Sequence, residues 1–434
     1  MKIIRKLALV IIGIFVLMLW SGIVRNVALG QRAAGPITGP IKTFSELPSN
    51  MKMAYKHYFQ APEYYLKTRA EDVNEINNLT YDLFGTYAYR DGSQFNIELK
   101  NFKNQDVIKN WILPIEFLGQ HYEVGQNDRL LPSKLLPNRG IVASLDERPG
   151  LVRIDSTSKI VWFNNEFIFH HGLNFDHDGN IWTPGVKHED GIIIPNTLSV
   201  DGSKIDYRDD VILSIDVETG KTLYSKSLTS LFLENDLEEL LNKANHVKDP
   251  FHLNDVQPVL NDHSEYFKKG DLFLSFRHLS AIILFRPSTN KVIKVLEGPF
   301  SFQHDIDIVS DSTVALFNNN TASWDVMFNK FEFKPSNGTI QRKISHSNVL
   351  IYNFDSDSYN ALYEDQFIEN EIFTSAEGLY ELLPNGDLFI EEQGQGVLWV
   401  LNKNGVVLKT TLKSDIDGYH YLPNWTTIYT NINF

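Results

Sequence analysis

The chain has 434 residues, of which 43% are hydrophobic and 12% aromatic, enough to bury a large core in one big domain or two ordinary ones. Lys and Arg number 40 against 54 Asp and Glu, so the formal net charge is -14, and a surface of that sign repels nucleic acid and anionic lipid. Cysteine is absent, which excludes disulfides, thiolate metal sites and cysteine nucleophiles.

The first predicted element is an apolar helix at the N-terminus. Three basic residues in the first six positions precede Leu7 to Val24, an uncharged stretch of 18 residues. About 20 apolar helical residues suffice to span a bilayer, and positive charge stays on the cytoplasmic side. We therefore assign residues 1–25 to a transmembrane anchor or a signal segment, with the length favouring an anchor. The rest of the chain is expected to be membrane-anchored and periplasmic, or secreted if the segment is cleaved.

Residues 26–78 are predicted to form a linker with some helical character. Glycine and proline punctuate its first part, and Met51 to Arg69 is a weakly helical, aromatic-rich stretch. From about residue 79 onward, short runs of β-branched and aromatic residues alternate with Asp-Gly, Asn-Gly and Thr-Gly turns. This pattern predicts an all-β domain over 79–434, with one helical insertion from Leu231 to Ala244.

One unit recurs through this domain: an apolar strand, a polar turn of about five residues and a second strand. Copies begin at Leu151, Ile212, Ile283, Leu350 and Leu398, with a looser copy at Phe95. Their spacing of roughly 45 to 70 residues matches a four-stranded propeller blade with its loops and is too long for a solenoid. The repeats therefore predict a six-bladed β-propeller.

A second pattern places histidines at equivalent positions of two blades. His171 in HGLNFDHDGNIW and His304 in HDIDIVSDSTVALF are each followed seven residues later by an aspartate in a predicted hairpin turn. Because the innermost strands of a propeller run beside its central channel, the two histidines are expected to face each other across the axis. His170 is the alternative to His171, which we prefer because it aligns with His304. A lone histidine would more often be a satisfied interior residue, and the shared position of two histidines makes a functional site an equal alternative.

Three further motifs follow in chain order. DPFHLN (249–254) contains the pattern D-x-x-H-x-N, SFR (275–277) contains S-x-R, and Gln303 precedes His304. Together with the closing stretch GLYELLPNGDLFIEEQ, these motifs make the chain over about residues 150–425 resemble the bacterial arylsulfotransferases. The better-known branch of that family carries a disulfide, which this chain lacks.

The resemblance implies a six-bladed propeller enzyme that moves a sulfuryl group from an aryl sulfate to a phenolic acceptor without a nucleotide donor. It implies that His304 is the nucleophile, that His252 and Arg277 hold the sulfate, and that His171 lies in the same channel. It also implies that Asn254 is a substrate-binding residue, as His170 would be if it took the place of His171. No cofactor, metal or nucleic acid is expected.

These residue types suit sulfuryl transfer on chemical grounds. The moving group carries charge on its oxygens, as in phosphoryl transfer, where catalysis is mostly positioning and charge stabilisation. Arg277 can offer a planar fork of N–H donors, and His252 and His171 can donate further hydrogen bonds or shuttle the phenolic proton. His304 must be neutral at its attacking nitrogen, which a nearby guanidinium favours by lowering its pKa. We expect a sulfohistidine intermediate and ping-pong kinetics.

Several alternatives remain open. Asp176, Asp178 and Asn180 could begin a calcium loop, although a hairpin turn is the favoured interpretation. A zinc centre of three histidines is disfavoured because Arg277 would repel the cation. A noncatalytic scaffold and an aryl sulfate hydrolase that uses the same site are the main functional rivals, and the length is short for an eight-bladed quinone-dependent dehydrogenase. Four tryptophans near the repeats could line an aryl-binding mouth but are more typical of core: Trp162, Trp182, Trp324 and Trp399.

Overall fold

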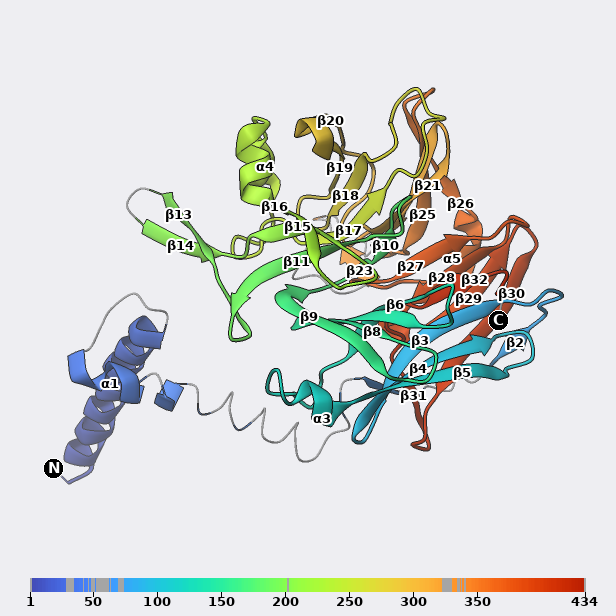
Figure 1. Ribbon diagram of the computed structural model, residues 1–434. Helices are drawn as coiled ribbons and strands as arrows, with labels where there is room; N and C mark the ends of the chain where they lie inside the picture. Colours follow the sequence, from blue (N-terminus) through green and yellow to red (C-terminus); the bar gives the residue numbers. More distant parts are fainter. Residues whose placement is uncertain are drawn as a thin grey trace. The chain divides into compact units, whose positions relative to one another are not determined.

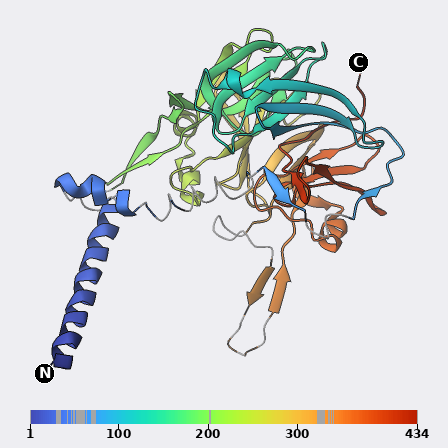
Figure 2. The ribbon, with the colours of Figure 1, turned by 90° about the horizontal axis from the view of Figure 1, so that it is seen from below.

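The computed structural model describes residues 2–28, 35–41, 43–45, 47, 51, 62, 64–68, 74–200, 203–321, 330–333, 336, 338 and 341–432. The chain divides into two units, Met1–Pro62 and Glu63–Phe434 (Figure 1). In the first unit, α1 (Lys2–Ala28) is one uninterrupted helix (Figure 2), and η1 (Gly35–Ile37) is a short 3-10 helix. The segment Val10–Val27 of α1 is long and apolar enough to cross a membrane, a property that a signal sequence shares.

The second unit is built mainly from antiparallel strands (Figure 1), which pair into groups of four. The first group is β32 (Thr427–Tyr429), β3 (Phe84–Asp91), β4 (Gln94–Asn101) and β5 (Val107–Pro114). The second is β6 (Leu130–Leu135), β7 (Ile141–Leu145), β8 (Arg148–Ile154) and β9 (Ile160–Phe169). The third is β10 (Asn174–Phe175), β11 (Ile181–Glu189), β15 (Asp210–Ile215) and β16 (Thr222–Ser227).

The remaining groups follow in chain order. The fourth is β17 (Leu253–Pro258), β18 (Leu272–Phe276), β19 (Ala281–Arg286) and β20 (Lys291–Leu296). The fifth is β21 (His304–Ser310), β22 (Thr313–Asn318), β25 (Asn348–Asn353) and β26 (Ser358–Leu362). The sixth is β27 (Leu379–Leu382), β28 (Leu388–Glu392), β29 (Val397–Asn402) and β30 (Gly405–Lys413).

Shorter elements flank these groups. The additional strands are β1 (Tyr65–Lys67), β2 (Ile76–Asn77), β12 (Ile192–Ile193), β13 (Asn196–Val200), β14 (Ser203–Tyr207), β23 (Lys330–Phe333), β24 (Gln341–Ile344) and β31 (Tyr419–Tyr421). The helices are α3 (Ile115–Leu118), α4 (Leu228–Glu234), η2 (Glu238–Lys243), η3 (Pro287–Thr289), α5 (Glu364–Glu369) and η4 (Gln393–Gln395). β13 and β14 form a two-stranded ribbon that extends away from the third group (Figure 1).

The groups close into a ring around a common channel. One small cavity is lined by residues of the first strand of every group, namely Thr427, Lys134, Asn174, Asp255, Asp305 and Tyr380. The ring is closed by the C-terminal strand β32, which pairs with β3 near the start of the domain, with Phe84 opposite Tyr429. Radial antiparallel groups around a channel define a β-propeller, so the predicted all-β propeller class is confirmed.

The hydrophobic core lies between neighbouring groups rather than at one centre. Among the described residues, each large cluster of buried apolar side chains joins two successive groups, including one that joins the sixth group to the first. Carboxylates add hydrogen bonds across the same boundaries. Asp255 accepts from Ile306 N at 3.0 Å, and Asp305 accepts from Tyr380 N at 2.9 Å. These contacts fix the innermost strands relative to one another.

The sequence repeats form the two outer strands of each group. The copy at Leu151 is the β8–β9 hairpin, and the others form β15–β16, β19–β20, β25–β26, β29–β30 and β4–β5. An aspartate closes some of the polar turns: Asp155 Oδ1 accepts from the N–H groups of Thr157 and Lys159 at 2.7 and 3.0 Å. The six repeats predict six blades. This number stays a prediction, because the second and third groups join in one nine-stranded sheet.

Two local predictions differ from the structure. The stretch from Leu231 to Ala244, predicted as one helix, is helical only in parts: α4 ends at Glu234, Asp236 takes a left-handed backbone with φ of 56°, and the 3-10 helix η2 follows. Most of the stretch from Met51 to Arg69 lies outside the described residues, but Tyr65–Lys67 within it is a strand paired with β31. Since β2 also pairs with β30, residues before 79 already contribute to the sixth sheet.

Candidate active site

Three histidines from different groups meet where the innermost strands begin. His171 precedes β10, His252 directly precedes β17, and His304 is the first residue of β21. The His171 ring centroid lies 5.1 Å from that of His252 and 5.6 Å from that of His304. His171 and His304, which the alignment places at equivalent positions of two blades, therefore lie close together, and His252 lies beside His171.

The backbone at two of these residues is unusual for their type. His171 has φ of 56° and His252 has φ of 46°, in the left-handed region that costs a residue with a Cβ about 1–2 kcal/mol. Each residue lies just ahead of an innermost strand, so the left-handed turn re-aims its imidazole before the strand begins. The surrounding contacts must hold this strain, as is common at functional sites.

His304 is held in one tautomer. Its Nδ1 lies 2.7 Å from Asn319 Oδ1, and Asn319 Nδ2 donates to the carbonyl oxygens of Thr374 at 2.9 Å and Glu377 at 2.7 Å. These two bonds orient the amide, so its oxygen must accept a hydrogen bond from the Nδ1–H group of His304. The Nε2 atom therefore carries the lone pair, and it is buried without a hydrogen bond from the residues the structure describes.

The charge state of His304 follows from its surroundings. Burial, and then the positive charge of Arg277, hold the pKa of His304 well below its ordinary value. The imidazole is fully buried and stays neutral at physiological pH. A neutral ring with an unshared pair on a fixed Nε2 is the form that a nucleophilic histidine requires.

Arg277 supplies the cation of the site and follows β18. Its guanidinium Nη1 donates to His278 Nε2 at 2.8 Å, Nη2 donates to Ser375 O at 3.5 Å, and Cζ lies 5.0 Å from the Phe302 ring centroid. The side chain is buried, and burial lowers its pKa to about 10, which leaves it charged at neutral pH. A buried guanidinium that keeps its charge is suited to hold a bound anion.

Asp249 and His252 form a carboxylate–imidazole pair. His252 Nδ1 donates to Asp249 Oδ2 at 2.6 Å, and its Nε2 lies 3.1 Å from Nε2 of His171. Burial alone would raise the pKa of Asp249, but the neighbouring His252 holds it well below its ordinary value. Burial also lowers the pKa of His171 well below its ordinary value. The ionised carboxylate of Asp249 fixes the orientation of the His252 ring through its hydrogen bond with Nδ1.

The residues of the three motifs are joined by buried hydrogen bonds. Asn254 Nδ2 donates to Gln303 O at 2.7 Å, and Gln303 Nε2 donates to Ser275 Oγ at 3.1 Å and to Phe276 O at 3.1 Å. The asparagine, serine and glutamine therefore fix three loops that carry His252, Arg277 and His304. A substrate-binding role for Asn254 stays a prediction, since its nitrogen is already used in this scaffold.

His170 lies beside the centre in an ionic network. It is fully buried, its Nε2 lies 3.5 Å from Asp210 Oδ1, and its ring centroid is 5.1 Å from that of His171. Arg208 Nε donates to the same Asp210 oxygen at 2.7 Å, and Asp210 Oδ2 accepts from Leu253 N at 2.8 Å. His171 rather than His170 contacts His304, as the alignment predicted.

Sequence reasoning missed several residues of the site. Asp249 lies within the D-x-x-H-x-N motif and His278 directly follows the S-x-R motif. Neither motif indicated the role of these residues in the site. Asn319 and Trp425 belong to no motif; the Trp425 ring centroid lies 5.2 Å from that of His171 and 6.1 Å from that of His304. Trp162, Trp182 and Trp399 pack in or against the cores between groups, and Trp324 lies outside the described residues.

The remaining metal alternative from the sequence is explained by local geometry. Asp176 Oδ1 accepts from Asp178 N and Asn180 N, both at 2.9 Å, and Gly179 has φ of 82°. These bonds are those of a hairpin turn between β10 and β11. The segment therefore has a structural explanation that requires no calcium ion.

The fold and this centre together define a β-propeller with three imidazoles and one buried guanidinium gathered at the inner ends of its sheets. The family model "Arylsulfotransferase (ASST)" matches residues 134–412, more than half of the chain. The chain belongs to this family. Comparison with curated proteins finds no match.

The comparison with solved structures finds matches that share little sequence with the chain. A protein of unknown function from Bacteroides caccae is 11% identical with a TM-score of 0.48, covering 80% of this chain and 98% of its own. Hydrazine synthase from Kuenenia stuttgartiensis is 11% identical with a TM-score of 0.41 and 80% coverage of both chains. An inactive variant of virginiamycin B lyase from Staphylococcus aureus with quinupristin is 11% identical, with a TM-score of 0.38 and coverage of 81% and 90%.

Proposed function

We propose that the protein transfers a sulfuryl group from an aryl sulfate to a phenolic acceptor through a sulfohistidine on His304. The observation that carries the proposal is the fixed tautomer of His304, whose Nε2 lone pair is buried beside the charge of Arg277. Family membership supports arylsulfotransferase-like chemistry. No nucleotide donor is required, because the aryl sulfate itself carries the group to be moved.

The first half-reaction forms a nitrogen–sulfur bond. The lone pair of His304 Nε2 attacks sulfur, the bond from sulfur to the aryl oxygen breaks, and the electron pair leaves with that oxygen. His252 delivers a proton to the departing phenolate, and the carboxylate of Asp249 stabilises the protonated ring before the transfer. Arg277 stabilises the charge spread over the sulfuryl oxygens.

The second half-reaction reverses these steps with a new phenol. The acceptor hydroxyl gives its proton to His252 as its oxygen attacks sulfur, and the nitrogen–sulfur bond breaks to restore neutral His304. Since the donor phenol leaves before the acceptor enters, ping-pong kinetics follow. Two aromatic side chains near the centre, Trp425 and Phe302, are the candidates for aryl contacts.

The N-terminal helix supports an extracytoplasmic location. α1 is compatible with a membrane anchor or a signal sequence, and basic residues lie at its N-terminal end. We propose that the propeller works on the far side of the membrane from the cytoplasm. Its partners there would be small phenolic molecules and their sulfate esters.

The direct test is detection of the intermediate. The intact protein is exposed to 4-nitrophenyl sulfate without an acceptor, and its mass is measured. A gain of one SO₃ group, lost again on addition of phenol, is the expected result. Release of many equivalents of nitrophenol per protein without any acceptor would identify a hydrolase that uses the same site. If neither an adduct nor nitrophenol is detected, the proposal is overturned and a noncatalytic propeller remains.

Asn319 is predicted to be a positioning residue for His304. Replacing Asn319 by alanine frees the imidazole to carry its proton on Nε2, and we expect kcat to fall by about 10- to 100-fold with little change in KM. Asn319→Asp keeps an acceptor for Nδ1 and should recover part of the rate. Its carboxylate raises the pKa of His304, so activity should be lost at a higher pH on the acid side than in the parent.

The control for this prediction is the neighbouring Asn320. This residue has φ of 53°, which glycine adopts without strain, so Asn320→Gly removes an adjacent amide and leaves the His304 contact in place. Initial rates across pH, with thermal unfolding of each variant, provide the measurement. An Asn319→Asp profile that overlays the parent's would contradict the positioning role.

A further inference from the structure

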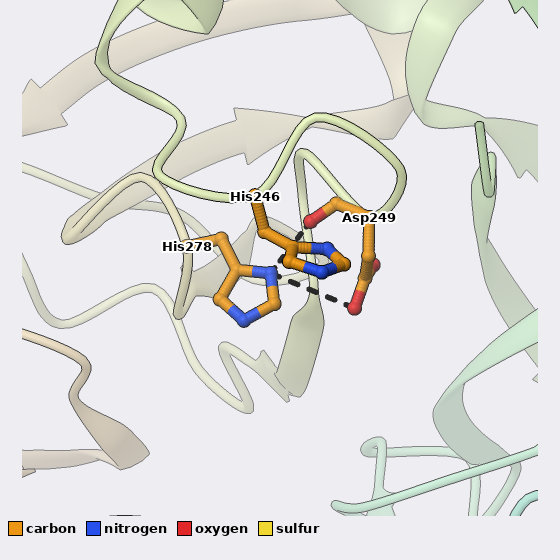
Figure 3. A group of neighbouring side chains, drawn as sticks. All are labelled: His246, Asp249 and His278. Atoms are coloured by element: carbon orange, nitrogen blue, oxygen red, sulfur yellow. Dashed lines mark hydrogen bonds and ion pairs between the residues drawn. The ribbon is translucent and has the colours of Figure 1, made fainter. Parts of the chain in front are cut away.

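Three side chains next to His252 and Arg277 offer the ligands of a metal ion. His246, Asp249 and His278 each offer one ligand atom, and these atoms all lie within 4.8 Å of one another (Figure 3). His246 and Asp249 belong to the segment before β17, and His278 follows Arg277 after β18. His278 is buried, and the other two are partly buried.

The chemistry of the ligand set selects a class of ion. Two imidazoles and one carboxylate favour borderline divalent transition metals such as Zn²⁺ and Co²⁺ over Ca²⁺ or Mg²⁺, which prefer oxygen ligands. Asp249 also has coordination capacity left. Its Oδ2 accepts from His252, but its Oδ1 is buried and accepts no hydrogen bond within the described part of the chain.

The proton position on His278 links this group to Arg277. A guanidinium only donates, so His278 Nε2 must accept from Arg277 Nη1 at 2.8 Å. The proton of the neutral ring is therefore on Nδ1, which donates to the carbonyl oxygen of Asp249 at 2.5 Å and lies 3.5 Å from Asp249 Oδ2 (Figure 3). The nitrogen that faces the other two ligands is thus protonated in the metal-free protein.

A metal ion at this nitrogen changes the contact on the opposite side of the ring. Ligation needs the lone pair of Nδ1, so the proton of the neutral imidazole moves to Nε2. The Nε2–H group then faces an N–H group of Arg277. Two hydrogen-bond donors thus oppose each other where the metal-free protein has a hydrogen bond. The ion also adds positive charge behind the guanidinium. Both effects displace Arg277 from its position beside the centre.

We propose that His246, Asp249 and His278 bind a divalent ion of the zinc class, and that the bound ion inhibits sulfuryl transfer by displacing Arg277. The binding half stands on the ligand geometry alone. The inhibitory half rests on the proposed function. Arg277, the residue that the bound ion would displace, is also the residue that holds the sulfuryl oxygens in the proposed reaction.

The test uses the full chain with Co²⁺ as a spectroscopic probe and Zn²⁺ as an inhibitor. We expect Co²⁺ to give a visible ligand-field band, and His246→Gln to weaken Co²⁺ binding by at least roughly tenfold. His246 has no part in the transfer chemistry, so the variant should keep the basal transfer rate and need at least roughly tenfold more Zn²⁺ for half-inhibition. His246→Asn is a second variant with a shorter side chain, and His263→Gln, on an exposed histidine, is the control.

The outcomes separate the two halves. No Co²⁺ band, or a band unchanged in both His246 variants, would overturn the site. Binding through His246 with a transfer rate insensitive to Zn²⁺ would overturn the inhibition and leave the site. Binding through His246 in a protein with no transfer activity would overturn the proposed function and, with it, the inhibitory half, while supporting the metal site.

Discussion

Replacing His304 by alanine is expected to lower the rate of sulfuryl transfer by about 10⁴-fold or more, as loss of a covalent nucleophile does in other enzymes. The imidazole Nε2 is the only protein atom that forms and breaks a bond with sulfur in the proposed cycle, and an alanine side chain offers no nucleophile in its place. The measurement is release of 4-nitrophenol from its sulfate ester with phenol as acceptor, together with the mass of the protein after exposure to the donor alone.

The controls distinguish chemistry from folding. His304 is fully buried, so alanine leaves a cavity and can lower the unfolding temperature. His304→Gln fills much of that space and can still hydrogen-bond to Asn319, but it offers no nucleophilic nitrogen. His263→Ala, at a histidine whose side chain is 72% exposed, should match the parent. A folded His304→Gln protein that still gains an SO₃ group would contradict the assignment of the nucleophile.

The convergence of the site could be predicted because the motifs carry both its chemistry and its scaffold. Asn254, Ser275 and Gln303 recur in the family pattern beside the catalytic candidates, and the structure gives the reason: they hydrogen-bond to one another and hold the loops in register. The motifs, although far apart along the chain, therefore identify residues that lie close together in the structure. The repeats likewise revealed the outer hairpins, since each hairpin is a local structure with its own turn.

What escaped prediction depends on contacts between distant elements. Asn319 acts through an amide whose orientation is set by carbonyl groups of Thr374 and Glu377, more than fifty residues away. Trp425 reaches the centre only because the chain closes its ring with β32. The proposed metal-binding group is equally hidden in the sequence, because the pairing of β17 with β18 is what brings His278 to His246 and Asp249.

The second large effect concerns Arg277. Replacing it by glutamine is expected to lower kcat/KM by about 10³-fold, because the charge that stabilises the sulfuryl oxygens is lost. Arg277→Lys should recover only part of this rate, since an ammonium restores the charge but not the planar fork of donors. Initial rates over a range of donor concentrations provide the measurement, and a glutamine variant with parental kcat/KM would contradict the role.

The pH dependence of the glutamine variant separates this role from an indirect one. Arg277 also lowers the pKa of His304, so its loss could in principle inactivate the enzyme by protonating the nucleophile. Burial, however, is the larger cause of that low pKa, and it persists in the variant. We therefore expect His304 to stay neutral near pH 7 and the rate to stay low when the pH is raised. Recovery of the parental rate at higher pH would show instead that Arg277 serves only to keep His304 unprotonated.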